Sequence, residues 1–286
     1  MQTRTLSFTF FALFCGILIS STESSAQSAQ NLNTSGANPT AGSKPVEVKP
    51  FAISAGLSKS ISLVNFQDGE RQETHDLELM ASYKWSLGTS LAIFTFSDDI
   101  RNPGNSDVGD IALAMAFNGW NLTRFKLVPS MTVVIPESKE SRINNNLETA
   151  LSGKLSAAIQ ERLLIPGFSF KGDLSFGRNI HRYETALDGT VLNKYASKQG
   201  LSAGYSIGIF SFAVDFSHIN FWTYQDTLQE FFEHTEETSL ALGEHFGFTL
   251  GHTNGGSVFK ENGYASNYQL IDENNSLVYA KVSLQY

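Results

Sequence analysis

The chain has 286 residues, of which 41% are hydrophobic and only 17% are charged, below the roughly 25% charged residues of ordinary soluble domains. Acids outnumber bases by 28 to 20, and the resulting net charge of −8 argues against a nucleic-acid-binding protein, which needs a basic surface. The mean hydropathy of −0.13 excludes a bundle of transmembrane helices. The single cysteine excludes a disulfide framework or a thiolate metal site.

The N-terminus has the three parts of a secretory signal peptide. Arg4 precedes the apolar run Leu6 to Ile19, and the small residues Ser24-Ser25-Ala26 follow. This pattern predicts a signal peptide over residues 1–26, which contains the only cysteine, Cys15. Residues 27–50 are rich in Ser, Asn, Gln, Thr, Gly and Pro. This composition predicts a flexible segment that cannot form a core.

Beyond Pro50 the dominant signal is alternation with a period of two residues. In the segment 76–86, Leu77, Leu79 and Tyr83 fall on one face, whereas Asp76 and Lys84 fall on the other. Such alternation is typical of β-strands whose two faces meet different environments. A helix would scatter the same apolar residues around its axis.

Twelve segments carry this pattern, and most are longer than the usual 5–6 residues of globular strands. They suit the roughly 9–11 tilted residues that cross a bilayer. The sequence therefore predicts an all-β fold over residues 51–286, a transmembrane antiparallel up-and-down β-barrel of about 12 strands. The predicted strands are Phe51–Val64, His75–Ser86, Thr89–Asp98, Asp107–Asn118, Leu122–Pro136, Asn146–Gln160, Leu163–Asn179, Lys198–Ile207, Phe210–Tyr224, Glu237–Gly243, Phe246–Thr253 and Leu277–Tyr286.

The connections between these segments alternate between short and long. An even number of strands then places the N- and C-terminal ends of the barrel-forming chain on the side of the short turns. One predicted long loop, Gln225–Glu236, holds Asp226, Glu230, Glu233 and Glu236 without a base. We expect this acidic loop, and with it most of the negative charge, to lie outside the membrane.

The last predicted strand ends the chain on an aromatic residue. Val278, Ala280, Val282, Leu284 and Tyr286 form one face, which resembles the C-terminal strand signature of Gram-negative outer-membrane β-barrel proteins. The resemblance extends over residues 51–286 and is one of architecture. It implies a location in the outer membrane, contact with its lipid and lipopolysaccharide, and an assembly signal in Val282, Leu284 and Tyr286 that the barrel-assembly machinery reads. A secreted soluble β-sandwich is the alternative, but its strands are typically shorter.

If the apolar faces meet lipid, the polar faces line the interior. The expected lining residues are Asp76, Glu78, Lys84, Asp110, Arg124, Lys126, Glu148, Lys154, Lys171, Asp173, Asp215 and Lys281. Acids and bases are balanced in this set. The charges either pair across the lumen and brace the wall or line a narrow aqueous path, and a barrel of about twelve strands lies between a filled and an open interior.

One stretch suggests an enzyme instead. His252 is expected to face lipid, in a segment loosely similar to the His-x-Ser-Asn-Gly motif of outer-membrane phospholipase A. In that family a serine stands two residues after the histidine, but here Asn254 holds that position. Ser257 is then the candidate nucleophile, and the resemblance implies lipid hydrolysis as a third function.

The sequence predicts a monomer with no cofactor, no metal site and no nucleic-acid partner. The expected function is a small porin or channel for passive diffusion of small hydrophilic solutes. The alternatives are a structural or surface-interaction barrel with a plugged lumen, and an outer-membrane lipid hydrolase.

Overall fold

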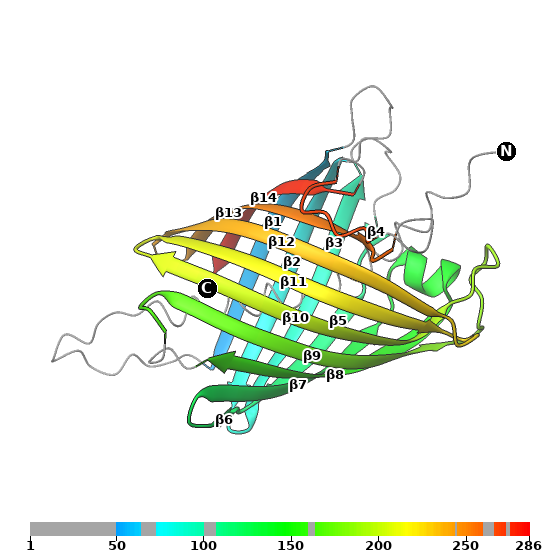
Figure 1. The fold of residues 1–286 in the computed structure, drawn as a ribbon, viewed down its shortest axis with the longest axis horizontal. Coiled ribbons are helices and arrows are strands. Elements are labelled where there is room, and N and C mark those ends of the chain that lie inside the picture. The colour runs from blue at the N-terminus through cyan, green and yellow to red at the C-terminus, as the bar shows by residue number, and fades with distance from the viewer. Residues whose placement is uncertain are drawn as a thin grey trace. The chain divides into compact units, whose positions relative to one another are not determined.

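The computed structural model describes residues 50–63, 73–99, 107–159, 164–243, 245–259, 266–272 and 275–286. The predicted signal peptide and residues 27–49 lie outside these ranges. Strands dominate the described chain (Figure 1). Their bounds are β1 Phe51–Ser62, β2 Glu73–Trp85, β3 Gly88–Asp99, β4 Asp107–Val108, β5 Ile111–Phe117, β6 Trp120–Asn121, β7 Phe125–Ile135, β8 Leu147–Ile159, β9 Phe168–His181, β10 Asn193–Ile207, β11 Phe210–Thr223, β12 Leu228–Leu242, β13 Phe246–Ser257 and β14 Leu277–Gln285.

The strands form one closed antiparallel barrel. Neighbours in sequence pair from β7 to β14, the last strand pairs with β1, and β1–β2–β3–β5–β7 completes the circuit. Twelve strands make the wall, and the short β4 and β6 are additional. The predicted fold and strand number are therefore confirmed. Closure gives each of the twelve wall strands two partners, and it removes the open sheet edges that lipid does not tolerate.

The seam joins the two ends of the described barrel chain. Nine residue pairs match β1 to β14, from Ser54↔Gln285 to Ser62↔Leu277. Two further backbone hydrogen bonds connect Ile53 and Tyr286, with N···O distances of 3.1 and 2.9 Å. Both ends therefore lie at the end of the barrel that carries tight turns such as 208–209, which we call the turn end. The opposite end is the loop end.

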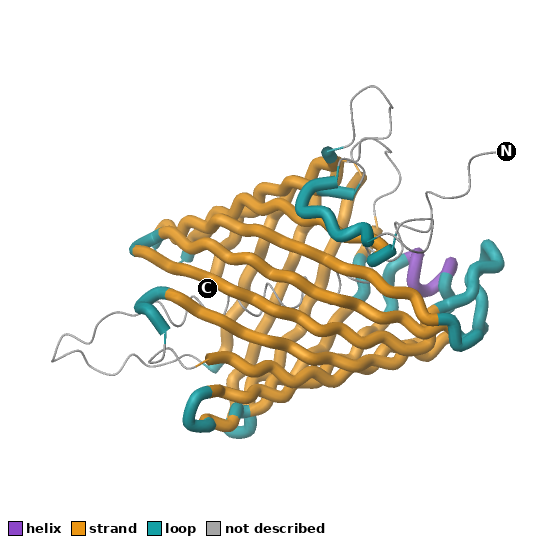
Figure 2. Tube along the Cα trace, in the orientation of Figure 1, coloured by secondary structure: helices purple, strands orange, loops and turns teal. Residues whose placement is uncertain are grey.

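The loop end carries the longer connections and the π-helix η1, Glu140–Asn144 (Figure 2). No helix in the described part of the chain is long and apolar enough to cross a bilayer.

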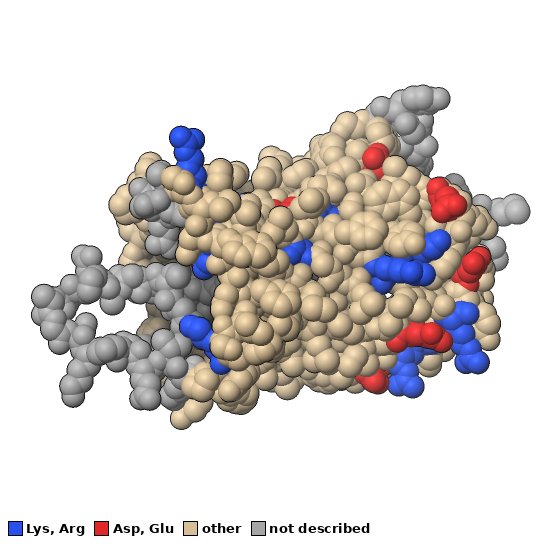
Figure 3. All heavy atoms as spheres, turned by 90° about the horizontal axis from the view of Figure 1, so that it is seen from below, with Lys and Arg blue, Asp and Glu red and all other residues tan. Residues whose placement is uncertain are grey.

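The outer surface of the barrel is apolar. Leu174, Leu201 and Val214 keep 57%, 54% and 45% of their surface exposed, although each lies in the middle of a strand. Figure 3 shows one side of the barrel, where uncharged residues cover most of the wall and most charged side chains gather toward the loop end. A closed barrel with an exposed apolar band is the arrangement of a membrane-spanning barrel.

The prediction of an acidic loop over residues 225–236 is wrong. Most of it is strand, because β12 begins at Leu228 and the connection from β11 is only Tyr224–Thr227. The hydroxyl of Thr223 accepts the backbone N–H groups of Gln225 and Thr227, at 3.3 and 3.1 Å, which closes the turn. The first half of β12 carries polar residues on both faces, so the sequence shows no alternation there.

Other bounds also differ from the prediction. The predicted strand 107–118 is interrupted at Gly109 and Asp110, where the carboxylate of Asp110 binds a loop. Trp120–Asn121 was expected in a turn but pairs with β7. The strand β10 begins at Asn193 rather than at residue 198, and β9 spans Phe168–His181 rather than 163–179.

Candidate functional site

The inner wall of the barrel is the candidate functional site. Side chains alternate along each strand, so residues opposite each other in the register share a face. Lys171 pairs with Ser202, and Ser202 with Asp215, which places the three on the face opposite to Leu174, Leu201 and Val214. The apolar band is exposed on the outside, so the polar face forms the interior.

Three charged groups meet on β8 and β9. The carboxylate of Asp173 lies 2.9 Å from Nζ of Lys171 and 3.9 Å from Nζ of Lys154. The Asp173 side chain is only 6% exposed, whereas each lysine keeps 20%. One buried carboxylate is thus shared by two lysines that still reach solvent, which leaves this part of the wall basic.

A second ion pair spans two strand spacings. Nζ of Lys198 on β10 lies 3.2 Å from Oε2 of Glu233 on β12, across the inner face of β11. On the same side of the barrel the hydroxyl of Ser202 donates to the carboxylate of Asp215. The sequence had placed Glu233 in an external loop and had not included Lys198, so both were missed as interior residues. Asp215 was expected to face inward, and it pairs with Ser202 on β10. Lys198 lies four residues before Ser202, so knowledge of this register would have placed Lys198 on the inner face as well.

Two long side chains of β14 cross a neighbouring strand at a glycine. The hydroxyl of Tyr279 donates to Glu237 on β12 by passing Gly251 on β13. In the other direction, Nζ of Lys281 reaches Oε1 of Glu78 on β2 at 3.2 Å, and it passes Gly56 on β1. These contacts tie β14 to the second strand on either side of it.

The charges are unevenly distributed around the wall. Lysines predominate on β8 to β10, where Lys154, Lys171 and Lys198 lie. Carboxylates predominate elsewhere, at Asp215, Glu233, Glu237, Glu78 and Asp76 on β11, β12 and β2. Asp76 accepts hydrogen bonds from Ser97 at 2.6 Å and from Ser58 at 3.4 Å. Each sign is thus in excess on a different part of the wall, while ion pairs such as Lys198–Glu233 and Lys281–Glu78 join the two.

Part of the interior is apolar. Met80 on β2, Ile93 on β3 and Ala112 on β5 form a buried cluster with 6%, 2% and 3% of their surface exposed, and Leu91 packs against it. Met80 shares the face of Glu78, so this cluster belongs to the inner wall. These inner side chains are therefore covered from solvent, unlike the lysines of β8 and β9.

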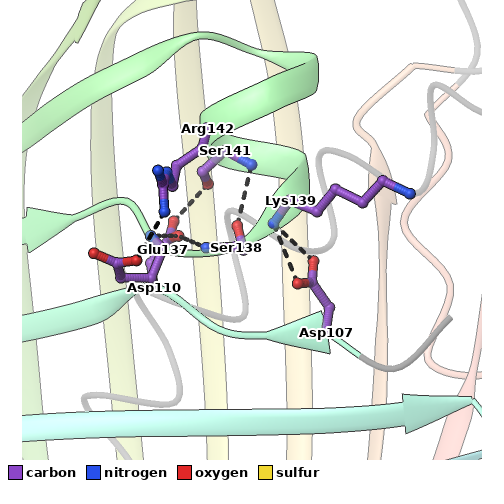
Figure 4. A network of polar contacts seen from close by, with 7 residues as sticks. All are labelled: Asp107, Asp110, Glu137, Ser138, Lys139, Ser141 and Arg142. Carbon is purple, nitrogen blue, oxygen red and sulfur yellow. Dashed lines mark hydrogen bonds and ion pairs between the residues drawn. The ribbon is translucent and has the colours of Figure 1, made fainter.

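Asp110 was expected in the lumen but anchors a loop (Figure 4). Its buried carboxylate accepts the backbone N–H groups of Glu137 and Ser138, both at 2.9 Å, and the hydroxyl of Ser141 at 2.5 Å. The neighbouring Asp107 binds the backbone N–H of Lys139. Because Asp110 is 2% exposed and bonded to residues 137–141, its carboxylate holds the loop and has little contact with solvent.

The remaining predicted lining residues lie near the two ends of the barrel. Lys84 lies near the end of β2, opposite Thr89, and Lys126 lies near the start of β7. Arg124 precedes β7, and Glu148 lies at the irregularity where β8 begins. All four are exposed. They lie apart from the ion pairs of the central wall.

The two residues of the predicted hydrolase site lie on opposite faces. His252 pairs with Glu236 on the outer face, whereas Ser257 pairs with Phe231 on the inner face. Nδ1 of His252 lies 3.8 Å from Oε2 of Glu236, whose other oxygen lies 3.0 Å from Nε2 of His234. The structure does not bring His252 and Ser257 together. No group of three or more His, Cys, Asp or Glu side chains suited to a metal ion occurs among the described residues.

Known structures share this fold. The NanC porin superposes with a TM-score of 0.53 and 11% identity, covering 82% of this chain and 98% of the porin. An outer-membrane channel from Pseudomonas putida F1 gives a TM-score of 0.57 and 10% identity, covering 82% of this chain and 95% of the channel. No protein-family model and no curated protein sequence matches the chain. The chain thus has the fold of outer-membrane porins and channels.

Proposed function

We propose that this protein is an outer-membrane channel for the passive diffusion of small hydrophilic solutes. The likeness in fold to a porin and an outer-membrane channel supports a channel-type barrel. The choice of small hydrophilic solutes rests on the inner wall, which carries charges of both signs and short polar side chains.

The observation that carries the proposal is the solvent access of the interior charges. Lys154, Lys171 and Lys281 keep 20%, 20% and 24% of their side-chain surface exposed while each is paired with a carboxylate. Charges removed fully from water are costly even when they are paired. A hydrated path along this wall therefore explains both the number of charges and their partial exposure.

Single-channel recording tests the proposal. The full mature chain, refolded and inserted in a planar lipid bilayer, is expected to give discrete conductance steps in salt solution. Reversal potentials in a salt gradient then report its ion selectivity. The absence of conductance from a correctly folded barrel would contradict the channel and favour the plugged alternative, for which the apolar cluster around Ile93 is the supporting observation.

The same proposal includes the location and partners of the protein. It places a monomer in the outer membrane of a Gram-negative bacterium, surrounded by lipid and lipopolysaccharide. It also proposes that Val282, Leu284 and Tyr286 act as the signal for the barrel-assembly machinery. Leu284 is 54% exposed and Tyr286 is 82% exposed at the turn end, where a receptor could reach them. Membrane fractionation, and loss of insertion on deletion of Tyr286, test these points.

A further inference from the structure

Residues 266–272 lie on the outside of the barrel, and we call this segment the strap. Its Tyr268 ring contacts Phe216 on β11 and Phe232 on β12, with ring centroids 5.9 and 4.9 Å apart. Both phenylalanines are on the outer face, since Phe216 pairs with Leu201 of the apolar band and Phe232 pairs with His218, two residues along β11 from Phe216. The strap therefore folds back from the loop end over the outer wall of β11 to β13.

Polar contacts hold the strap in place. The side-chain amide of Asn254 on β13 donates to the backbone carbonyl of Gln269 at 2.6 Å. At the start of the strap, Phe259 and Ser266 form a β-bridge, and the backbone N–H of Asn267 donates to Val258 at 2.8 Å. Asn254 is 1% exposed and Phe232 is 4% exposed although both face outward. The strap thus covers a polar part of the wall directly above the apolar band.

Three apolar side chains of the strap remain largely uncovered. Leu270 and Ile271 expose 67% and 66% of their surface, and Tyr268 exposes 46%. Phe216, against which Tyr268 packs, is itself an exposed member of the apolar band. The apolar band therefore continues through the contact between Phe216 and Tyr268 onto the strap.

We propose that the strap is a lipid-binding element that inserts Leu270 and Ile271 into the bilayer leaflet on the side of the loop end. The hydrophobic effect disfavours two adjacent exposed apolar side chains in water, and the neighbouring band already meets acyl chains. By covering Asn254, the strap also keeps a polar group away from lipid. These observations favour lipid acyl chains near the headgroup boundary as the partner of Leu270 and Ile271. This inference concerns the outer surface and does not depend on an open lumen.

Site-specific fluorescence tests the proposal, because the only cysteine lies in the predicted signal peptide. In a Cys15→Ser background, Ile271→Cys and, separately, Leu270→Cys are labelled with an environment-sensitive fluorophore. The full barrel is then reconstituted in vesicles that contain lipids carrying a doxyl quencher close to the headgroup. Leu174→Cys in the apolar band is the membrane control, and Leu187→Cys, 70% exposed in the loop 182–192, is the aqueous control.

We expect the label at position 271 to be quenched as strongly as the label at position 174, and its emission to be shifted to the blue. Quenching as weak as that at position 187, with emission typical of water, would overturn the proposal. A blue shift without lipid quenching that grows with the protein-to-lipid ratio would also overturn it, because a second copy of the chain would then cover the strap. Position 270 gives an independent reading if the change at 271 disturbs folding.

Discussion

At the scale of single residues, Gly251 explains how Tyr279 reaches across a strand. A methyl group at position 251 would lie 2.6 Å from Cε1 of the Tyr279 ring, which is too close for two carbon atoms. We therefore expect Gly251→Ala to rotate the ring away and break its hydrogen bond to Glu237. The expected loss is about 1 kcal/mol of unfolding free energy, typical of one hydrogen bond, measured from urea unfolding in lipid vesicles.

The barrel offers a matched control for this substitution. Gly153 also lies in the middle of a strand, but nothing lies within 4 Å of the position of an added Cβ. Gly153→Ala should therefore leave the unfolding midpoint unchanged or raise it slightly. In a Tyr279→Ala background the cost of Gly251→Ala should disappear, since the two changes act on one contact. An equal cost with and without the ring would show that the glycine serves the backbone instead.

At the scale of elements, Asp110 fixes the loop 136–146 to the start of β5. Asp110→Ala removes the acceptor of two backbone N–H groups and one hydroxyl, and unsatisfied buried groups cost about 1–3 kcal/mol each. We expect the loop to open while the barrel stays folded, so that trypsin cleaves faster after Lys139 and Arg142. Mass spectrometry of limited digests in vesicles measures this rate.

A carboxylate in the neighbouring outer loop is the control for Asp110. Asp188 accepts the backbone N–H of Thr190 at 2.9 Å, a bond within its own turn. This bond lowers the pKa of Asp188 below its usual value. Asp188→Asn should leave cleavage after Lys139 unchanged. If Asp110→Ala leaves it unchanged as well, the hydrogen bonds of Asp110 do not hold the loop.

The sequence predicted elements well where membrane and lumen impose opposite faces. Segments such as β2 and β8 alternate because one face meets lipid and the other meets water or ions. The prediction was wrong at β12, since residues 228–236 lie beyond that constraint and carry polar groups on both faces. It also could not show that Asp110 binds a loop, or that Tyr279 crosses Gly251. Such contacts depend on the register between strands, which alternation within one strand does not contain.

At the scale of the whole molecule, the change at β12 moves negative charge from an external loop into the lumen. Glu233 and Glu237 join Asp215 on one sector of the wall, opposite in sign to the lysines of β8 to β10. The interior remains close to balanced in number, with lysines in excess on β8 to β10 and carboxylates in excess on β11 and β12, although Lys198 pairs with Glu233. The net charge of −8 therefore says little about selectivity. Ion selectivity depends instead on which interior charges a permeating ion approaches most closely.

Two substitutions that remove interior charges of opposite sign are expected to have opposite effects. Glu237→Gln removes a negative charge from the lumen and should lower the cation-to-anion permeability ratio, whereas Lys171→Met should raise it. An ion that passes about 4 Å from one unit charge in water gains or loses about 1 kcal/mol. The largest change that we expect in the permeability ratio is therefore several-fold. The adjacent Glu236 is the control, because it is half exposed on the outer face beside His234. Glu236→Gln should leave the reversal potential unchanged, and an equal shift from Glu236→Gln and Glu237→Gln would show that ions do not pass along the inner face of β12.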